Sequence, residues 1–120
     1  MQIHMTVGER SASATLADNP TARDFASLLP VTLNMSDLFG LEKPGRLPRA
    51  LDQGGNPVFS YKVGQLGYWS PGEDLAIVYA VKGSGSIPSP GLIPIGTVDV
   101  GLATIAEAGD AFQLRIEQVS

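Results

Sequence analysis

The sequence has no cysteine, a single histidine and no long apolar run. Without cysteine there is no disulfide, no thiolate metal ligand and no cysteine nucleophile. With His4 as the only histidine, a nucleophile–base relay and a histidine metal site both lack their usual parts. We therefore expect no catalytic residue of these kinds, no metal site and no cofactor.

Apolar stretches are short throughout the chain. None approaches the ~20 apolar residues of a membrane span. The first seven residues alternate between polar and apolar, whereas a secretory signal has a basic start followed by a continuous apolar run. We expect a cytoplasmic protein that does not bind membranes.

Cations are also scarce. Eight Lys and Arg stand against 12 Asp and Glu, which gives a formal net charge of −4. A surface of that sign repels a phosphate backbone unless cations are clustered locally. Arg46 and Arg49 are the nearest thing to a cluster, and two arginines in a Pro-rich loop are typical of solvated side chains. The sequence therefore predicts no nucleic-acid partner.

What the chain does contain is enough apolar material for one folded unit. Its 120 residues are 43% hydrophobic and 17% charged, a composition that supports a core. A chain of this length has no room for two domains of ordinary size. We predict a single domain over residues 1–120.

One segment has every signal of an α-helix. Asn19 suits the N-cap, Pro20 suits the first helical position, and Pro30 stops the helix. Apolar residues between them recur at i, i+3, i+4 and i+7, which places them on one face. The pattern predicts a helix over 20–29 that packs on a sheet.

Elsewhere the dominant pattern is the polar–apolar alternation of strands. Strands are predicted at 2–7, 12–16, 31–35, 59–63, 65–69, 75–81, 92–100 and 111–119. One or two short helical turns are expected, the clearer at 101–108, and residues 41–57 and 82–90 are predicted to be irregular loops. About eight short strands with one helix favour a mainly β fold, a closed antiparallel barrel.

Several groups of residues resemble one protein family. They are the helix start at 18–22 with Phe25, the Leu28-Leu29-Pro30 ending, Glu42 and Leu47-Pro48, Gly64 with Tyr68 and Pro71, the segment 75–79, and Gly91-Leu92-Ile93-Pro94-Ile95-Gly96. In these the chain is similar to small prokaryotic proteins with a cyclophilin-like fold. The resemblance implies an eight-stranded barrel related to that of peptidyl-prolyl isomerases, in a group whose activity is generally unassigned. The chain departs from it at Gly64-Gln65-Leu66, where relatives tend to have Gly-Asp-Ile.

The resemblance does not extend to the isomerase residues. Cyclophilins with that activity pair an arginine with a Phe-Met-x-Gln run, and this sequence contains no such run. Aromatic residues nevertheless gather beside the Pro-rich loop. Each taken singly is typical of a core, but together they are the best candidates for a pocket wall. The candidate binding residues are Glu42, Arg46, Phe59, Tyr61, Tyr68 and Trp69.

The sequence favours a binding module for a small molecule or an extended peptide, without proline isomerase activity. A divergent peptidyl-prolyl isomerase, with Arg46 aimed at the twisting amide, is the alternative. A second alternative is a structural or homo-oligomerising domain in which Leu38, Phe39 and Trp69 form a subunit contact.

Overall fold

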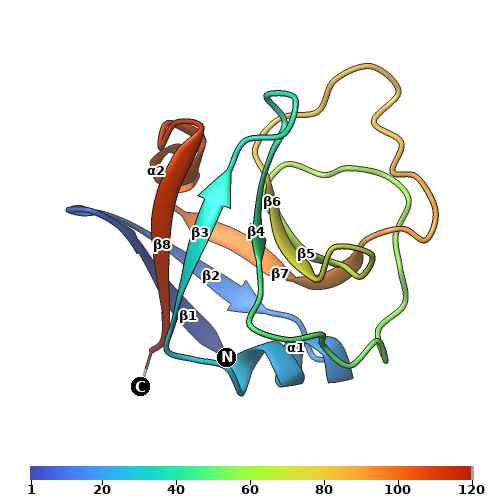
Figure 1. The fold of residues 1–120 in the computed structure, drawn as a ribbon, viewed down its shortest axis with the longest axis horizontal. Coiled ribbons are helices and arrows are strands. Elements are labelled where there is room, and N and C mark those ends of the chain that lie inside the picture. The colour runs from blue at the N-terminus through green and yellow to red at the C-terminus, as the bar shows by residue number, and fades with distance from the viewer. Residues whose placement is uncertain (120) are drawn as a thin grey trace.

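Residues 1–119, which the computed structural model describes, form a closed barrel of eight antiparallel strands with two short helices (Figure 1). Around the barrel the strands follow the order β1-β2-β7-β5-β6-β4-β3-β8. The mainly β barrel predicted from the alternation is confirmed. The elements are β1 (Gln2–Val7), β2 (Arg10–Leu16), α1 (Pro20–Ala26), β3 (Val31–Ser36), β4 (Glu42–Arg46), β5 (Gln65–Trp69), β6 (Asp74–Val78), β7 (Ile93–Val100), α2 (Leu102–Ala106) and β8 (Ala111–Gln118).

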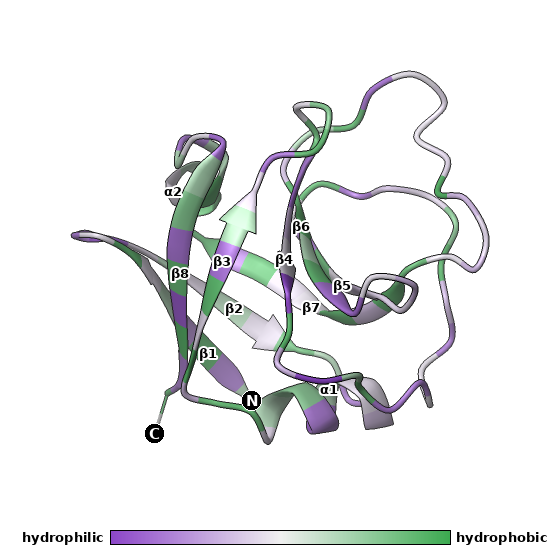
Figure 2. Cartoon of the chain, viewed as in Figure 1, coloured by the Kyte–Doolittle hydropathy of each residue, from purple (hydrophilic) through white to green (hydrophobic). Residues whose placement is uncertain are grey.

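The barrel interior is filled by the apolar members of each alternating strand. Ile3 and Met5 on β1 and Leu114 and Ile116 on β8 are fully buried, while their polar neighbours face outward. Figure 2 shows the same alternation as a change of colour along β8. Successive side chains of a strand point to opposite faces, so one row of apolar residues per strand is enough to build this core.

Helix α1 covers one end of the barrel (Figure 1) and contributes Ala22 and Phe25 to the core. The Asn19 side chain accepts a hydrogen bond of 2.8 Å from the Ala22 amide, as an N-cap should. The helix ends at Ala26, three residues earlier than predicted, because the chain tightens there: the Leu29 amide donates to the carbonyl of Ala26. No helix within residues 1–119 has the length and apolar composition that crossing a membrane requires.

Two strand assignments were wrong. The segment predicted as irregular begins with β4, which pairs with β6 over five residues from Glu42↔Val78 to Arg46↔Asp74. Strand β4 lacks the polar–apolar alternation of a strand, because its inward-facing positions are Lys43 and Gly45 instead of apolar residues.

Conversely, the strand predicted at 59–63 is absent from the barrel. Val58 and Ser60 make only isolated bridges, to Leu92 and Ser86. Strand β6 also ends at Val78 instead of residue 81, and the next two amides, of Tyr79 and Ala80, both donate to the Leu41 carbonyl. The segment around Val58 therefore pairs with the loop before β7, and together they form a layer outside the barrel.

Candidate functional site

The outer face of β4, β6 and β5 is unlike the rest of the barrel surface because two long segments, 47–64 and 79–92, fold over it (Figure 1). The register sets Pro44 opposite Ala76, and Ala76 opposite Gly67. These residues are small or flat, so the sheet leaves space beneath the covering segments. A second apolar cluster, separate from the barrel core, forms here from Ala76, Ile87 and Leu92.

Between the sheet and its cover lies a cavity of about 560 Å³, which we call the outer pocket. This volume is in the range of small-molecule sites. Apolar and aromatic side chains make up most of its wall, with two carboxylates and one lysine. The lining residues are Leu38, Phe39, Leu41, Glu42, Pro44, Tyr61, Trp69, Asp74, Ala76, Lys82, Ser84, Gly85, Ser86, Ile87, Pro88 and Leu92.

Gly67 shows how closely the cover sits on the sheet. A Cβ atom at this position would collide with the side chain of Leu92. Glycine at residue 67 therefore allows Leu92 of the covering segment to lie directly on the strand, where it lines the outer pocket.

The two carboxylates of the outer pocket are both disfavoured as charges. Glu42 is only 7% exposed. Burial raises the pKa of Glu42, the Tyr61 hydroxyl lowers it in part, and the nearby charge of Asp74 raises it further. Burial likewise raises the pKa of Asp74, which Arg46 lowers in part. Burial and then the Glu42 carboxylate raise the pKa of Tyr61 to about 12, so its hydroxyl stays protonated and can donate.

The predicted site residues divide into two groups. Glu42, Tyr61 and Trp69 come together in the outer pocket although they belong to different segments. Tyr68, Phe59 and Arg46 lie outside it. Tyr68 is fully buried in the barrel core, where its hydroxyl accepts a 3.1 Å hydrogen bond from the Leu51 amide.

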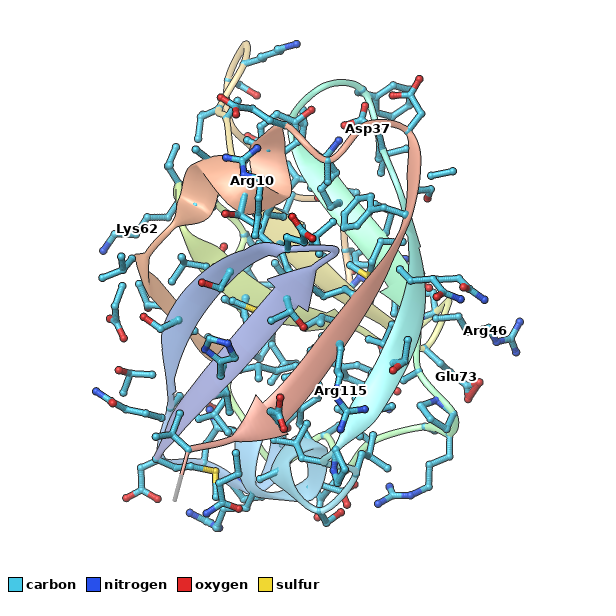
Figure 3. All side chains as sticks on the ribbon, turned by 90° about the vertical axis from the view of Figure 1, so that its left-hand side faces the viewer. Arg10, Asp37, Arg46, Lys62, Glu73 and Arg115 are labelled. Carbon is cyan, nitrogen blue, oxygen red and sulfur yellow. The ribbon has the colours of Figure 1, made fainter. Side chains whose placement is uncertain are left out.

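Phe59 is 51% exposed and packs near Gly91. The side chain of Arg46 is 78% exposed and pairs with Glu73 at 3.5 Å. Figure 3 shows Arg46 and Glu73 at the edge of the molecule, with the arginine directed outward.

Other lining residues were not predicted from the sequence, namely Asp74, Lys82 and the serines of the 82–90 loop. Asp74 reaches the outer pocket because β6 pairs with β4 in a particular register, and Lys82 because the loop folds back. Neither contact has a local sequence signal. The nearest signal is the weight of Gly, Ser and Pro in 82–90, which marks the loop but not what it covers.

A cluster of charges braces the 37–43 segment from the inner side. The Lys43 ammonium lies 3.0 Å from Asp37 Oδ1 and donates a 2.7 Å hydrogen bond to the Gly109 carbonyl. It also lies 5.0 Å and 5.8 Å from the ring centres of Tyr79 and Phe112. Hydrogen bonds from Tyr79 and then Lys43 lower the pKa of Asp37 to about 2. The neighbouring residues 38, 39 and 41, which line the outer pocket, are thereby held in place.

The covering segment 47–64 is joined to the side chain of Asp24 on α1. Arg49 donates to both carboxylate oxygens of Asp24, at 2.9 and 2.8 Å, and the Asp52 amide donates to the same carboxylate at 2.7 Å. The Arg49 bonds, followed by the Asp52 amide, lower the pKa of Asp24 to about 2.

Within residues 1–119, no group of three or more His, Cys, Asp or Glu side chains is arranged to hold a metal ion.

Comparison with known proteins agrees with this architecture. The hypothetical protein AF2241 from Archaeoglobus fulgidus, whose solution structure is known, matches with a TM-score of 0.79 at 17% identity, over 99% of this chain and 95% of that chain. McbB, solved in complex with tryptophan, matches with a TM-score of 0.71 at 12% identity, over 97% of this chain and 44% of McbB. At these identities the likeness concerns the fold alone.

No curated protein matches the sequence. The model of the cyclophilin-like family matches residues 5–117, nearly the whole chain. The resemblance noted in the sequence is thereby confirmed, and the chain belongs to the cyclophilin-like family.

Proposed function

We propose that this protein is a binding module that holds a small organic molecule in the outer pocket and has no proline isomerase activity. The observation that carries the proposal is the cavity of about 560 Å³ with aromatic walls and a buried carboxylate. Pockets that are mostly apolar, with a few polar groups that fix orientation, are typical of small-molecule sites.

The fold comparison supports a small molecule over a peptide. McbB, which has a similar barrel over 97% of this chain, was solved with tryptophan, a single small molecule. The barrel of residues 1–119 is also closed, so it presents no edge strand to which an extended peptide could pair by strand addition.

The isomerase alternative is less well supported. Catalysis of X-Pro rotation needs a cation or donor aimed at the twisting amide above an apolar slot. Arg46, the residue expected to supply it, has a side chain that is 78% exposed and pairs with Glu73 outside the outer pocket. Binding is therefore the function that these residues serve best.

The protein contains its own reporter, because Trp69 is its only tryptophan and lies in the pocket wall. We would screen small aromatic compounds by Trp69 fluorescence and compare wild type with two variants. Ser86→Phe puts a ring into the pocket from an exposed loop position, and Ser11→Phe adds the same ring on β2, far from it. We expect hits whose binding is lost in Ser86→Phe and kept in Ser11→Phe. Absence of any such hit would contradict the proposal.

A parallel assay addresses the isomerase alternative directly. Isomerisation of a panel of X-Pro tetrapeptides is followed with wild type, Arg46→Ala and Trp69→Ala. We expect no rate above that of buffer. A rate that disappears in Arg46→Ala would instead establish a divergent isomerase.

A further inference from the structure

We propose that the ligand of the outer pocket is a cation, an amine carried on an apolar or aromatic body, whose ammonium group binds against the Glu42 carboxylate. This inference rests on the proposed function and specifies the chemical class of the ligand. It follows from one feature of the site: a buried carboxylate faces the cavity without a cationic partner.

Glu42 is buried and borders the cavity. It lies on the outer side of β4, is 7% exposed and lines the outer pocket. A buried carboxylate is costly unless it is paired or hydrogen-bonded. Over residues 1–119, Glu42 takes part in no salt bridge with Lys, Arg or His. A bound cation would supply the missing partner.

The cations near Glu42 already have other partners. Lys82 lines the outer pocket, but its ammonium donates to the Phe39 carbonyl at 3.3 Å. Arg46 lies beside Asp74 and pairs with Glu73. Lys43 follows Glu42 in the chain but points to the opposite face of β4, toward Asp37.

The remaining charged group of the pocket has the same sign as Glu42. Asp74 lines the wall, and its negative charge acts on Glu42. The Tyr61 hydroxyl is neutral and gives Glu42 only partial relief. Two carboxylates and one engaged lysine give the outer pocket a negative potential, which attracts ammonium groups and repels carboxylates.

The rest of the wall suits an apolar body. Tyr61 and Trp69 contribute aromatic rings, and Ile87 and Leu92 supply aliphatic surface. Aromatic rings stack with rings of a ligand and also favour a neighbouring cation. The pocket therefore combines an apolar body site with a carboxylate at one wall, the arrangement that an aralkylamine fits.

Four compounds that share a phenyl ring test this inference: phenethylamine, phenethyl alcohol, phenylalanine and phenylpropionate. Binding is measured by Trp69 fluorescence and by amide chemical shifts of residues lining the outer pocket. We expect phenethylamine to bind about tenfold more tightly than the alcohol, because a charge-assisted hydrogen bond exceeds a neutral one. Phenylalanine and phenylpropionate should bind more weakly than the amine.

Two variants test whether Glu42 causes the preference for the amine over the alcohol. Glu42→Gln keeps the shape and removes the charge, so the preference for amine over alcohol should fall about tenfold. Glu9→Gln removes one charge in the exposed β1–β2 turn and should leave the preference unchanged. Should Glu42→Gln fail to fold, the wild type still provides a test. Its affinity for the amine should fall as acid protonates Glu42, while its affinity for the alcohol should not.

The outcomes separate the two proposals. Equal binding of amine and alcohol at the outer pocket, or a preference that survives in Glu42→Gln, overturns the cation inference and leaves the pocket as a binding site. If no compound of the series or of the wider screen shifts pocket residues, the proposed function fails as well.

Discussion

The two faces of β4 each carry a buried charged residue, and only the one on the inner face has an ion-pair partner in residues 1–119. Lys43 points inward, is 2% exposed and has an ion-pair partner, a carbonyl acceptor and two aromatic rings around its ammonium. Glu42, its neighbour in sequence, points outward, is 7% exposed and makes no ion pair within the described chain. One of two adjacent buried charges is thus fully paired, while the other has no ion-pair partner within residues 1–119, and the ligand proposal rests on this contrast.

The largest effect should come from the inner face. Lys43→Met keeps the apolar stem but removes the ammonium, which strips a partner from Asp37 and from the Gly109 carbonyl. We expect the free energy of unfolding to fall by about 3 kcal/mol, the scale for breaking a buried pair. Urea unfolding measures this, and Lys62→Met, at an exposed lysine, is the control. A loss no larger than that of the control would show that the inner cluster contributes little.

Alanine substitutions at two glycines allow the packing of the inner face and the outer face of the sheet to be compared. Gly45→Ala points its new methyl inward against Met35 and to 3.1 Å from the Asn34 carbonyl, so overpacking should cost about 2 kcal/mol. Gly67→Ala presses outward on Leu92, which has the outer pocket beside it to move into. We expect a smaller loss of stability, about 1 kcal/mol, together with weaker ligand binding. Thermal unfolding and the Trp69 binding assay measure the two effects, and the reverse ranking of stability would contradict this comparison.

Removing the charge of Glu42, which has no ion-pair partner in residues 1–119, should raise the free energy of unfolding, whereas removing that of Lys43 should lower it. Glu42→Gln deletes a carboxylate that burial penalises, so the unliganded protein should become more stable by about 1 kcal/mol at neutral pH. Urea unfolding of Glu42→Gln beside Glu9→Gln provides the measurement. Destabilisation by Glu42→Gln alone would mean that the Glu42 charge has a structural partner.

The pH profile should show the smallest but most characteristic effect. Because the pKa values of Glu42 and Asp74 are raised in the folded state, the folded protein binds their protons more readily. Stability therefore falls as pH rises above the unfolded values, 4.5 for Glu42 and 3.8 for Asp74. The pKa values of Asp24 and Asp37 are lowered to about 2, so the stability they contribute is present above about 3.8 and is lost as pH falls toward 2. The free energy of unfolding should therefore be largest at about pH 4, and its decline toward neutral pH should be shallower in Glu42→Gln than in wild type.

Most of the fold could be predicted from the sequence because its signals are local. Asn19 and Pro20 act as the capping rules require, and alternation in β1 and β8 reflects one buried face. Strand β4 could not be found in this way. Its inward positions are occupied by Gly45, which makes room for Met35, and by Lys43, whose charge is satisfied by distant residues.

The site was predictable only in part, for a related reason. Tyr68 and Trp69 are adjacent aromatic residues of one strand, yet one fills the core and the other lines the outer pocket. Composition beside a loop indicated that aromatics would gather, but which face each occupies depends on register. Tyr61 and Asp74 meet the same cavity through pairings between segments, which no local pattern encodes.

The covering segments can vary in sequence more freely than the barrel. No side chain from 52–64 or 79–92 belongs to the barrel core, which closes on its own residues beneath them. Within them, residues 82–90 also stay clear of the Tyr79–Asp37–Lys43 cluster, so substitutions there can reshape the wall of the outer pocket while the barrel core is unchanged. Under the proposed function, exchange of 82–90 between family members should change which apolar body the outer pocket accepts, while Glu42 on β4 keeps the preference for a cation.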